Sequence, residues 1–318
     1  MKIKRLIVTT AFILVVSTST LSINDYSSHQ ITKIIMEDNE QNIKPNIPII
    51  AHRGFSSLEI ENSYNAVKLG FDSNCTTAVE IDVQLTKDNE IVLFHDSKIN
   101  DKEISEYTLE ELQEIPITEK ILDNFDTYMD TLFDSKSGNI ARERMHILEK
   151  KSEHISTLDE ILLLHSCYPN KKLIIELKNI DDDKELLMDK VFDKIKDLNK
   201  QNIIIQSSNY EALIKMKNKY PNLEYHLIVN KNNYDYIKNN DLDGYGIKKN
   251  LVNYNDIDSL LKNNKKVSIW TINTYSDYEE VTNILADLKN NVSYITNYPD
   301  ALRTWHNLIN KNKVKIKK

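Results

Sequence analysis

The chain has 318 residues, of which 40% are hydrophobic and 28% charged, with a formal net charge of −7. This length and apolar content suit one large domain with a substantial core, and the negative charge excludes a general basic surface for nucleic acid. Cys75 and Cys167 are too few and too far apart for a zinc cluster or a redox pair. They are therefore either two free thiols or one disulfide.

The N-terminus has the order of an export signal. A basic start, MKIKR, precedes the apolar run LIVTTAFILVVS, and small polar residues follow it. The run is short for a membrane span, which favours a secretory signal peptide, with an uncleaved anchor as the alternative. We predict a signal peptide or membrane anchor over 1–22 and a linker over 23–46. The protein is then secreted or attached to the outer face of the cytoplasmic membrane, where association with the membrane or envelope is open to it.

Short apolar runs alternate with amphipathic segments from residue 47 onward, which is typical of repeated β-α units and a parallel sheet. Eight such runs are expected strands: 47–51, 78–85, 172–177, 202–207, 223–229, 243–247, 266–270 and 292–296. Eight is the number of strands that closes a barrel. The fold class is therefore α/β, with a TIM (β/α)8 barrel over 47–306 and a basic tail over 307–318.

The run IVLF, residues 91–94, is not one of the eight strands. Only TKDNE separates it from the run 78–85, too few residues for a parallel crossover, so IVLF should return antiparallel and carry His95 back toward the barrel. Residues 97–156 then interrupt the rhythm between the second and third strands. We interpret them as an insertion on the catalytic face.

Capping signals mark the expected helix starts. The candidates are Asn62 and the pairs Thr108/Glu111, Thr157/Glu160, Ser208/Glu211 and Ser276/Glu279.

Ionisable residues gather at the expected carboxyl ends of the strands, where barrel enzymes place their chemistry. Glu80 and Asp82 share one face of their strand, and Glu176 lies on the next strand, so the three carboxylates can converge. Oxygen ligands suit a hard divalent cation, Ca²⁺ or Mg²⁺. The alternative is a charged strand edge with incidental histidines.

Other residues at these strand ends suit acid/base work on a phosphate. His52 and His95 can divide proton removal and proton donation between them. Arg53 and Lys178 offer positive charge to phosphate oxygens. Trp270 is either an apolar wall for a small alcohol or part of the core.

These motifs resemble the glycerophosphodiester phosphodiesterases. The residues HRG, EN, E-x-D-V-Q-L-T-K-D, V-x-F-H-D, I-E-L-K and W-T-x-N follow one another from His52 to about Pro299. The resemblance implies a metal-dependent TIM-barrel enzyme that cleaves small glycerophosphodiesters to glycerol 3-phosphate and an alcohol, through a cyclic intermediate opened by water.

The resemblance also implies a role for each matching residue. His52 and His95 correspond to the acid/base pair, Arg53 and Lys178 to phosphate contacts, and the remaining matches to metal ligands: Glu80, Asp82 and Glu176, with Glu61 as a further candidate.

The chain departs from the family pattern in three places. Ile60 replaces the proline of P-E-N-T, SKINDKEIS follows H-D, and the closing T-D-x-P is here Thr296-Asn297-Tyr298-Pro299. We expect these departures to affect substrate choice and to leave the metal and acid/base residues untouched. The alternatives are a phospholipase-like or teichoic-acid-degrading phosphodiesterase and, in another class, a non-catalytic binding barrel. The oligomeric state stays open.

Overall fold

The structure is a computed structural model that describes residues 47–118, 151–178, 185–198 and 202–316. The predicted signal peptide or anchor over 1–22, the linker over 23–46 and the middle of the insertion lie outside the described residues. Among the described residues, no helix is both long enough and apolar enough to span a bilayer.

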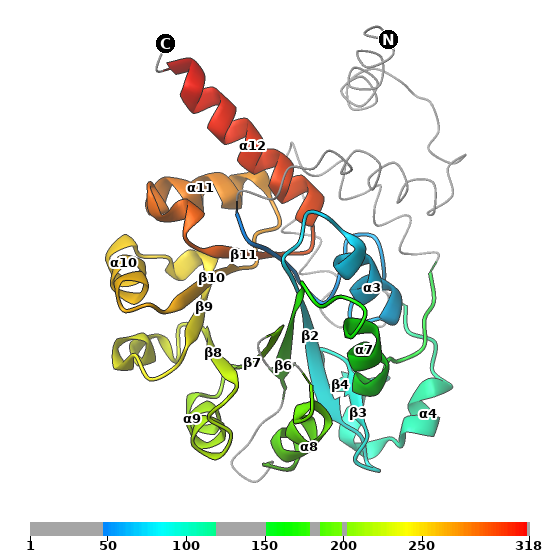
Figure 1. The fold of residues 1–318 in the computed structure, drawn as a ribbon. Coiled ribbons are helices and arrows are strands. Elements are labelled where there is room, and N and C mark those ends of the chain that lie inside the picture. Colours follow the sequence, from blue (N-terminus) through cyan, green and yellow to red (C-terminus); the bar gives the residue numbers. More distant parts are fainter. Residues whose placement is uncertain (1–46, 119–150, 179–184, 199–201, 317–318) are drawn as a thin grey trace, which may run out of the picture. The chain divides into compact units, whose positions relative to one another are not determined.

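Eight parallel strands close into a ring in the described part of the chain (Figure 1). Strand β1 pairs with β11 on one side and with β2 on the other, which completes the barrel. The predicted TIM barrel and its eight strands are therefore confirmed. The bounds are β1 Ile49–Ala51, β2 Ala78–Leu85, β6 Lys172–Leu177, β7 Ile203–Ser207, β8 Glu224–Val229, β9 Gly244–Lys248, β10 Lys266–Trp270 and β11 Ser293–Thr296.

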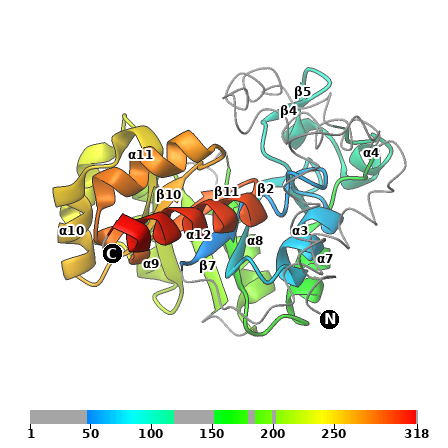
Figure 2. The ribbon, with the colours of Figure 1, turned by 90° about the horizontal axis from the view of Figure 1, so that it is seen from above.

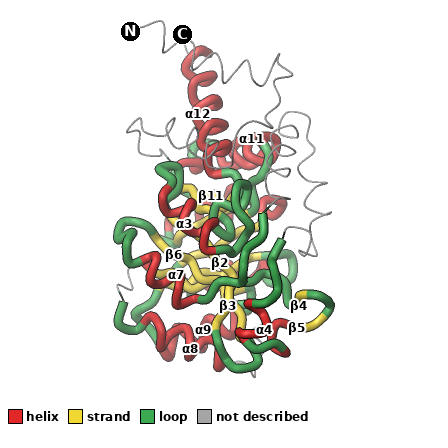
Figure 3. Tube along the Cα trace, turned by 90° about the vertical axis from the view of Figure 1, so that its right-hand side faces the viewer, coloured by secondary structure: helices red, strands yellow, loops and turns green. Residues whose placement is uncertain are grey.

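Helices surround the strands (Figures 1 and 3). The α-helices outside the insertion are α3 Tyr64–Asp72, α7 Leu158–His165, α8 Glu185–Ile195, α9 Tyr210–Lys219, α10 Tyr254–Lys262, α11 Tyr275–Leu285 and α12 Pro299–Ile316. The 3₁₀ helices are η2 Ile104–Glu106, η5 Tyr234–Asn239, η6 Lys249–Leu251 and η7 Leu288–Asn290.

The two faces of the strands have different chemistry, as a filled barrel requires. In β2, Val79, Ile81 and Val83 belong to the main core cluster, which also takes residues from the surrounding helices. The alternate residues of β2 include Glu80 and Asp82, which point into the barrel. The odd–even alternation of AVEIDVQL thus places carboxylates inside the barrel and apolar side chains between sheet and helices.

The interior is layered from its amino end to its carboxyl end. At the amino end, Glu224 of β8 forms ion pairs with Lys266 of β10 and Lys172 of β6, which lie on alternate strands. Above them is a small apolar cluster of Ile50, Ala78, Ile174, Ile204 and Ile295. Glu80 and Glu176 follow two residues after Ala78 and Ile174, so the carboxylates stand on this apolar floor.

Strand β3, Ile91–Leu93, returns antiparallel to β2, as predicted for IVLF. Beyond it, the described part of the insertion contains β4 Lys98–Ile99, β5 Lys102–Glu103 and α4 Leu109–Gln113. Figure 2 shows these elements on the same side of the barrel as α3. A second apolar cluster, which includes Phe94 and Leu112, joins the insertion to Ile60 in the loop after β1.

The helix-start predictions had mixed outcomes. The capping boxes at Thr108 and Thr157 are present. Ser208 and Ser276 are not caps: Asn209 caps α9 and Thr274 caps α11, because these residues hold the extended backbone just before each helix and accept a hydrogen bond from its first turn.

The structure also tests the predicted basic tail and the possible disulfide. Helix α12 continues to Ile316, so most of the predicted basic tail over 307–318 is helical; no proline or glycine after Pro299 stops it. Cys75 is buried and Cys167 exposed, and the two thiols are not joined. The open question of a disulfide is thereby answered: Cys75 and Cys167 do not form one with each other.

Candidate active site

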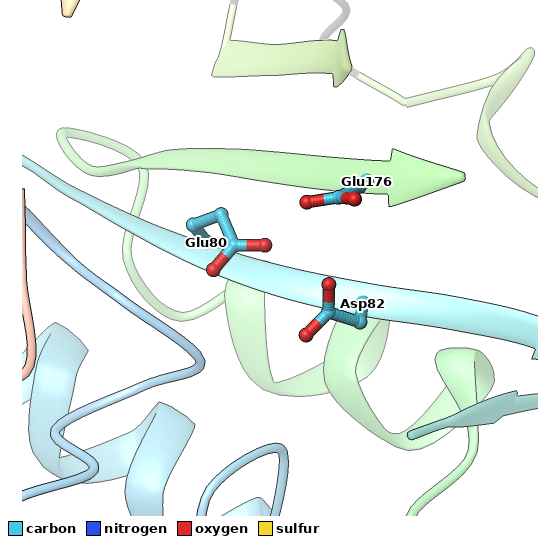
Figure 4. A group of neighbouring side chains, drawn as sticks. All are labelled: Glu80, Asp82 and Glu176. Atoms are coloured by element: carbon cyan, nitrogen blue, oxygen red, sulfur yellow. The ribbon is translucent and has the colours of Figure 1, made fainter. Parts of the chain in front are cut away.

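Three carboxylates converge inside the barrel, as the spacing predicted (Figure 4). Glu80 and Asp82 project from one face of β2, and the parallel register places Glu176 of β6 opposite Asp82. One carboxylate oxygen of each residue lies within 4.8 Å of the others. Side chains from two neighbouring strands therefore form one acidic cluster, which we call the acidic triad.

Two cations lie against the acidic triad. The Arg53 Nε atom is 3.2 Å from Asp82 Oδ2, and the Lys178 Nζ atom is 2.7 Å from Glu176 Oε1 and 3.3 Å from Asp82 Oδ1. Arg53 also donates its backbone N–H to Glu80 Oε2 at 2.9 Å. The predicted phosphate residues thus lie beside the predicted metal ligands, and Asp82 touches both cations.

The donor set fits a divalent cation. Burial, followed by the negative charges of Asp82 and Glu176, raises the pKa of Glu80 well above its usual range. Its Oε1 atom is buried and has no hydrogen-bond partner among the described residues. An oxygen in that condition is costly to bury, and a hard cation held by the three carboxylates would remove the cost.

His52 follows directly after β1, and its orientation is fixed from the far end of the chain. Its Nδ1 atom is 2.7 Å from Asn297 Oδ1. The amide oxygen accepts, so Nδ1 carries the proton and Nε2 is left as the free acceptor. Burial, followed by the positive charge of Arg53, lowers the pKa of His52 to about 3.

The turn after His52 needs unusual backbone. Arg53 has a φ of 55° and Gly54 a φ of 81°. A Cβ on Gly54 would lie 2.4 Å from the carbonyl carbon of Ala66 in α3, closer than any real contact. The glycine of the HRG motif therefore lets the loop pass over α3 and return Glu61 and Asn62 to the site.

His95 follows β3 and comes back to the barrel, as predicted. Its Nδ1 atom is 2.6 Å from Asp96 Oδ1. The Gln84 amide donates to the carbonyl oxygens of Phe94 and Asp96, each at 2.7 Å, which fixes the backbone on both sides of the histidine. The charge of His95 acts on Asp82 and Glu176 and on His52, so the two imidazoles and the acidic triad share one electrostatic environment.

Asn62 does not cap α3, and this prediction is wrong. Ser63 is the cap, since its hydroxyl accepts from the Ala66 N–H. Asn62 instead adopts a φ of 57° and faces Asp82. Its amide donates to Asp82 Oδ2 at 2.9 Å and accepts from the Asp82 N–H at 3.0 Å. It therefore orients the central carboxylate of the acidic triad.

Glu61 and Trp270 occupy the edges of the site. Glu61 Oε1 accepts a hydrogen bond from the Arg53 guanidinium at 2.7 Å. Glu61 does not belong to the acidic triad, so its role as a metal ligand stays a prediction. Trp270 is half-buried, donates its Nε1–H to the Gly246 carbonyl at 2.8 Å, and packs on the apolar floor. The packing agrees with the core interpretation, and the role of Trp270 as a wall for the alcohol stays a prediction.

One sequence expectation about the site fails. The replacement of aspartate by Asn297 in the closing motif was expected to leave the acid/base residues untouched, yet Asn297 is the hydrogen-bond partner of His52. The separation of 245 positions hides this contact in the sequence. The signal that could have revealed it is the parallel pairing of β1 with β11, which brings the two strand ends together.

A closed (β/α)8 barrel with acidic, basic and imidazole groups at the carboxyl ends of its strands is the arrangement of a barrel enzyme. The chain belongs to the Glycerophosphoryl diester phosphodiesterase family, whose model matches residues 52–301, and it is a hydrolase of phosphoric diesters. The family match does not favour the phospholipase-like or teichoic-acid-degrading alternative.

Individual relatives agree with the family. The protein YhdW of Bacillus subtilis is 26% identical over 274 residues, covering 80% of this chain and 96% of that protein. A phosphodiesterase of Oleispira antarctica, solved with its product sn-glycerol-3-phosphate, has a TM-score of 0.61 at 22% identity over 82% of this chain and 96% of that one. A glycerophosphodiester phosphodiesterase of Parabacteroides distasonis has a TM-score of 0.59 at 20% identity over 84% of this chain and 100% of that one. The structural likenesses establish the shared fold.

Proposed function

We propose that this protein is a metal-dependent glycerophosphodiester phosphodiesterase that releases glycerol 3-phosphate and an alcohol by paired histidine catalysis. The observation that carries the proposal is the convergence of Glu80, Asp82 and Glu176 within 4.8 Å in the interior of the barrel, in the same electrostatic environment as His52 and His95. The product complex of the Oleispira antarctica relative supports the choice of a small glycerophosphodiester as substrate.

The hydrogen bonds of the two imidazoles support different roles. The amide of Asn297 leaves His52 Nε2 unprotonated, which suits a base that accepts the proton of the substrate's neighbouring hydroxyl as that oxygen attacks phosphorus. The carboxylate of Asp96 stabilises a protonated His95, which suits an acid that donates its Nε2 proton to the departing alcohol oxygen. Water then opens the cyclic phosphate with the two roles reversed.

The acidic triad would hold the divalent cation, Ca²⁺ or Mg²⁺. A cation bound there supplies positive charge for the phosphate oxygens during attack. Arg53 and Lys178 add fixed positive charge beside it, and their pairing with Asp82 keeps that carboxylate ionised and ready to ligate. The chain's own groups thus position the phosphate and move the protons.

A screen of purified protein tests the proposal. Wild-type protein should release glycerol 3-phosphate from at least one diester among glycerophosphocholine, glycerophosphoglycerol and glycerophosphoethanolamine, and EDTA should abolish the release until Ca²⁺ or Mg²⁺ is restored. His52→Ala protein is the control for contaminating hydrolases. Absence of release from every diester with metal present would refute the activity.

We also propose export of the protein, on the sequence of residues 1–22 alone. A basic start followed by a short apolar run is typical of a leader that is cleaved or retained as an anchor. Fractionation of cells that express the full chain, with N-terminal sequencing of the product, tests this. Recovery of the intact chain from the cytoplasmic fraction would contradict it.

A further inference from the structure

The rim of the barrel carries a lysine that the proposed reaction does not use. Lys248 is the last residue of β9, and it is exposed. The register places it directly beside Trp270 of β10. The Lys248 Nζ atom lies 5.6 Å from the centre of the Trp270 ring. Among the described residues, no carboxylate lies within ion-pair distance of this ammonium group.

The alternation of β9 directs Lys248 toward the interior of the barrel. Gly246, two residues earlier, faces inward: a Cβ there would approach Gln206, Ser268 and the Trp270 ring. Lys248 therefore belongs to the inward face, at the carboxyl end where the acidic triad opens. The next residue, Lys249, lies on the opposite face and pairs with Asp277 of α11 at 2.6 Å.

Trp270 connects this lysine to the site. Its indole ring is held by the hydrogen bond to the Gly246 carbonyl and rests on the apolar floor that also supports Glu80 and Glu176. The ring is therefore held on the same apolar floor as the two carboxylates. An aromatic face of this kind attracts a cationic group, but here the protein's own ammonium group already lies over it.

We propose that Lys248 selects the alcohol portion of the substrate, favouring a hydroxyl-rich or anionic alcohol over a cationic one. This inference rests on the proposed function. A cationic head group that approaches Trp270 meets the like charge of Lys248, whereas hydroxyl or carboxylate oxygens can accept its N–H groups. The substrates are then diesters of polyols such as glycerol, rather than of choline.

The test compares kcat/KM for glycerophosphoglycerol and glycerophosphocholine in the same assay. Wild-type protein should favour glycerophosphoglycerol by roughly tenfold, the size of a partly screened charge contact. Lys248→Met should remove most of that preference, and Lys248→Glu should shift it toward glycerophosphocholine by roughly another tenfold. Lys249→Met is the matched control, because it removes the same charge from the outer face, and it should keep the wild-type ratio.

Two results would overturn the inference: an unchanged ratio in both Lys248 variants, or an equal loss on both substrates, which would make Lys248 a phosphate contact. Calorimetric affinities of the same proteins for the two diesters give a second ratio that needs no turnover. Absence of turnover in wild-type protein would therefore refute the proposed reaction. An affinity ratio for the two diesters that is the same in wild type and the Lys248 variants would refute the role of Lys248 in substrate choice.

Discussion

Two carboxylates on the same strand face have opposite protonation tendencies in this site. Burial alone would raise the pKa of Asp82, but the charges of Lys178 and Arg53 hold it far below its usual range. Burial raises the pKa of Glu80, the charges of Asp82 and Glu176 raise it further, and the opposing effect of Arg53 is smaller. The placement of two cations against Asp82 therefore decides which carboxylate stays ionised when no metal compensates the acidic triad.

The amide of Asn297 should set the pH range of the reaction. A carboxylate at this position would favour the imidazolium form of His52 and raise its pKa from about 3. Because the base works only when neutral, Asn297→Asp should move the acidic limb of the kcat/KM profile upward by about one pH unit or more. Asn297→Leu should lower kcat without that movement, since it removes the acceptor and adds no charge.

The exposed Asn291→Asp variant is the control for added charge and should leave the profile in place. An unmoved acidic limb in Asn297→Asp would mean that His52 is not the base whose protonation the profile reports.

Each histidine should be essential for turnover, and the losses of kcat from the two substitutions should not add. His52→Gln and His95→Gln should each lower kcat by roughly 10² to 10⁴, with KM changed little, because each removes one proton transfer and no principal binding contact. The double variant should lose little more than the worse single variant, as expected for groups that act as one unit. His154→Gln is the control, since His154 is exposed and bonds only the Gln113 carbonyl among the contacts described. Retention of a tenth or more of kcat in either single variant would contradict the pairing.

Elements whose signals are local could be predicted from sequence. The capping boxes at Thr108 and Thr157 use residues three positions apart, and the short connection before IVLF excludes a parallel return. The predictions failed where a side chain forms hydrogen bonds with a residue far from it in the sequence. Asn62 looks like a cap but serves Asp82, because the turn through Gly54 brings it back to the barrel.

The ion pairs at the amino end of the barrel should stabilise strand β8 in a pH-dependent way. Burial raises the pKa of Glu224, but the hydrogen bond and charge of His226, with those of Lys266 and Lys172, outweigh it and lower the pKa to about 2. A carboxylate with a lowered pKa contributes stability that is complete above about pH 4.5 and lost as pH falls through about 2. Glu224→Gln should therefore lower the free energy of unfolding by about 2 kcal/mol at pH 7, allowing for the partly exposed side chain.

Urea unfolding at pH 7 and at pH 3 measures this difference, which should shrink markedly at the lower pH. Asp235→Asn, on a carboxylate that is 91% exposed, should show no measurable change at either pH. If Glu224→Gln lowers the free energy of unfolding equally at pH 7 and pH 3, the loss comes from packing rather than from charge.

The barrel as a whole explains which parts of the site the sequence could not disclose. Eight apolar runs predicted the ring, and alternation within AVEIDVQL predicted which carboxylates face inward. Closure of the ring is a pairing of β1 with β11, and only closure brings Asn297 to His52. Contacts within one strand or between consecutive strands are readable from spacing, whereas those that depend on closure require the three-dimensional register.

A cation at the acidic triad should stabilise the folded barrel, because its ligands come from β2 and β6 and meet only when the two strands pair. At a cation concentration of 100 times Kd, binding adds about 2.7 kcal/mol to the free energy of unfolding, which should raise Tm by about 5 °C.

Without the cation, the raised pKa of Glu80 makes stability fall as pH rises above about 4.5, since the unfolded chain releases that proton more readily. Glu80→Gln should therefore be at least as stable as wild type in EDTA, and its Tm should not rise when Ca²⁺ or Mg²⁺ is added. The control is Asp193→Asn, on an exposed helix position, which should keep the rise in Tm. Equal rises in wild type and Glu80→Gln would place the stabilising cation elsewhere on the molecule.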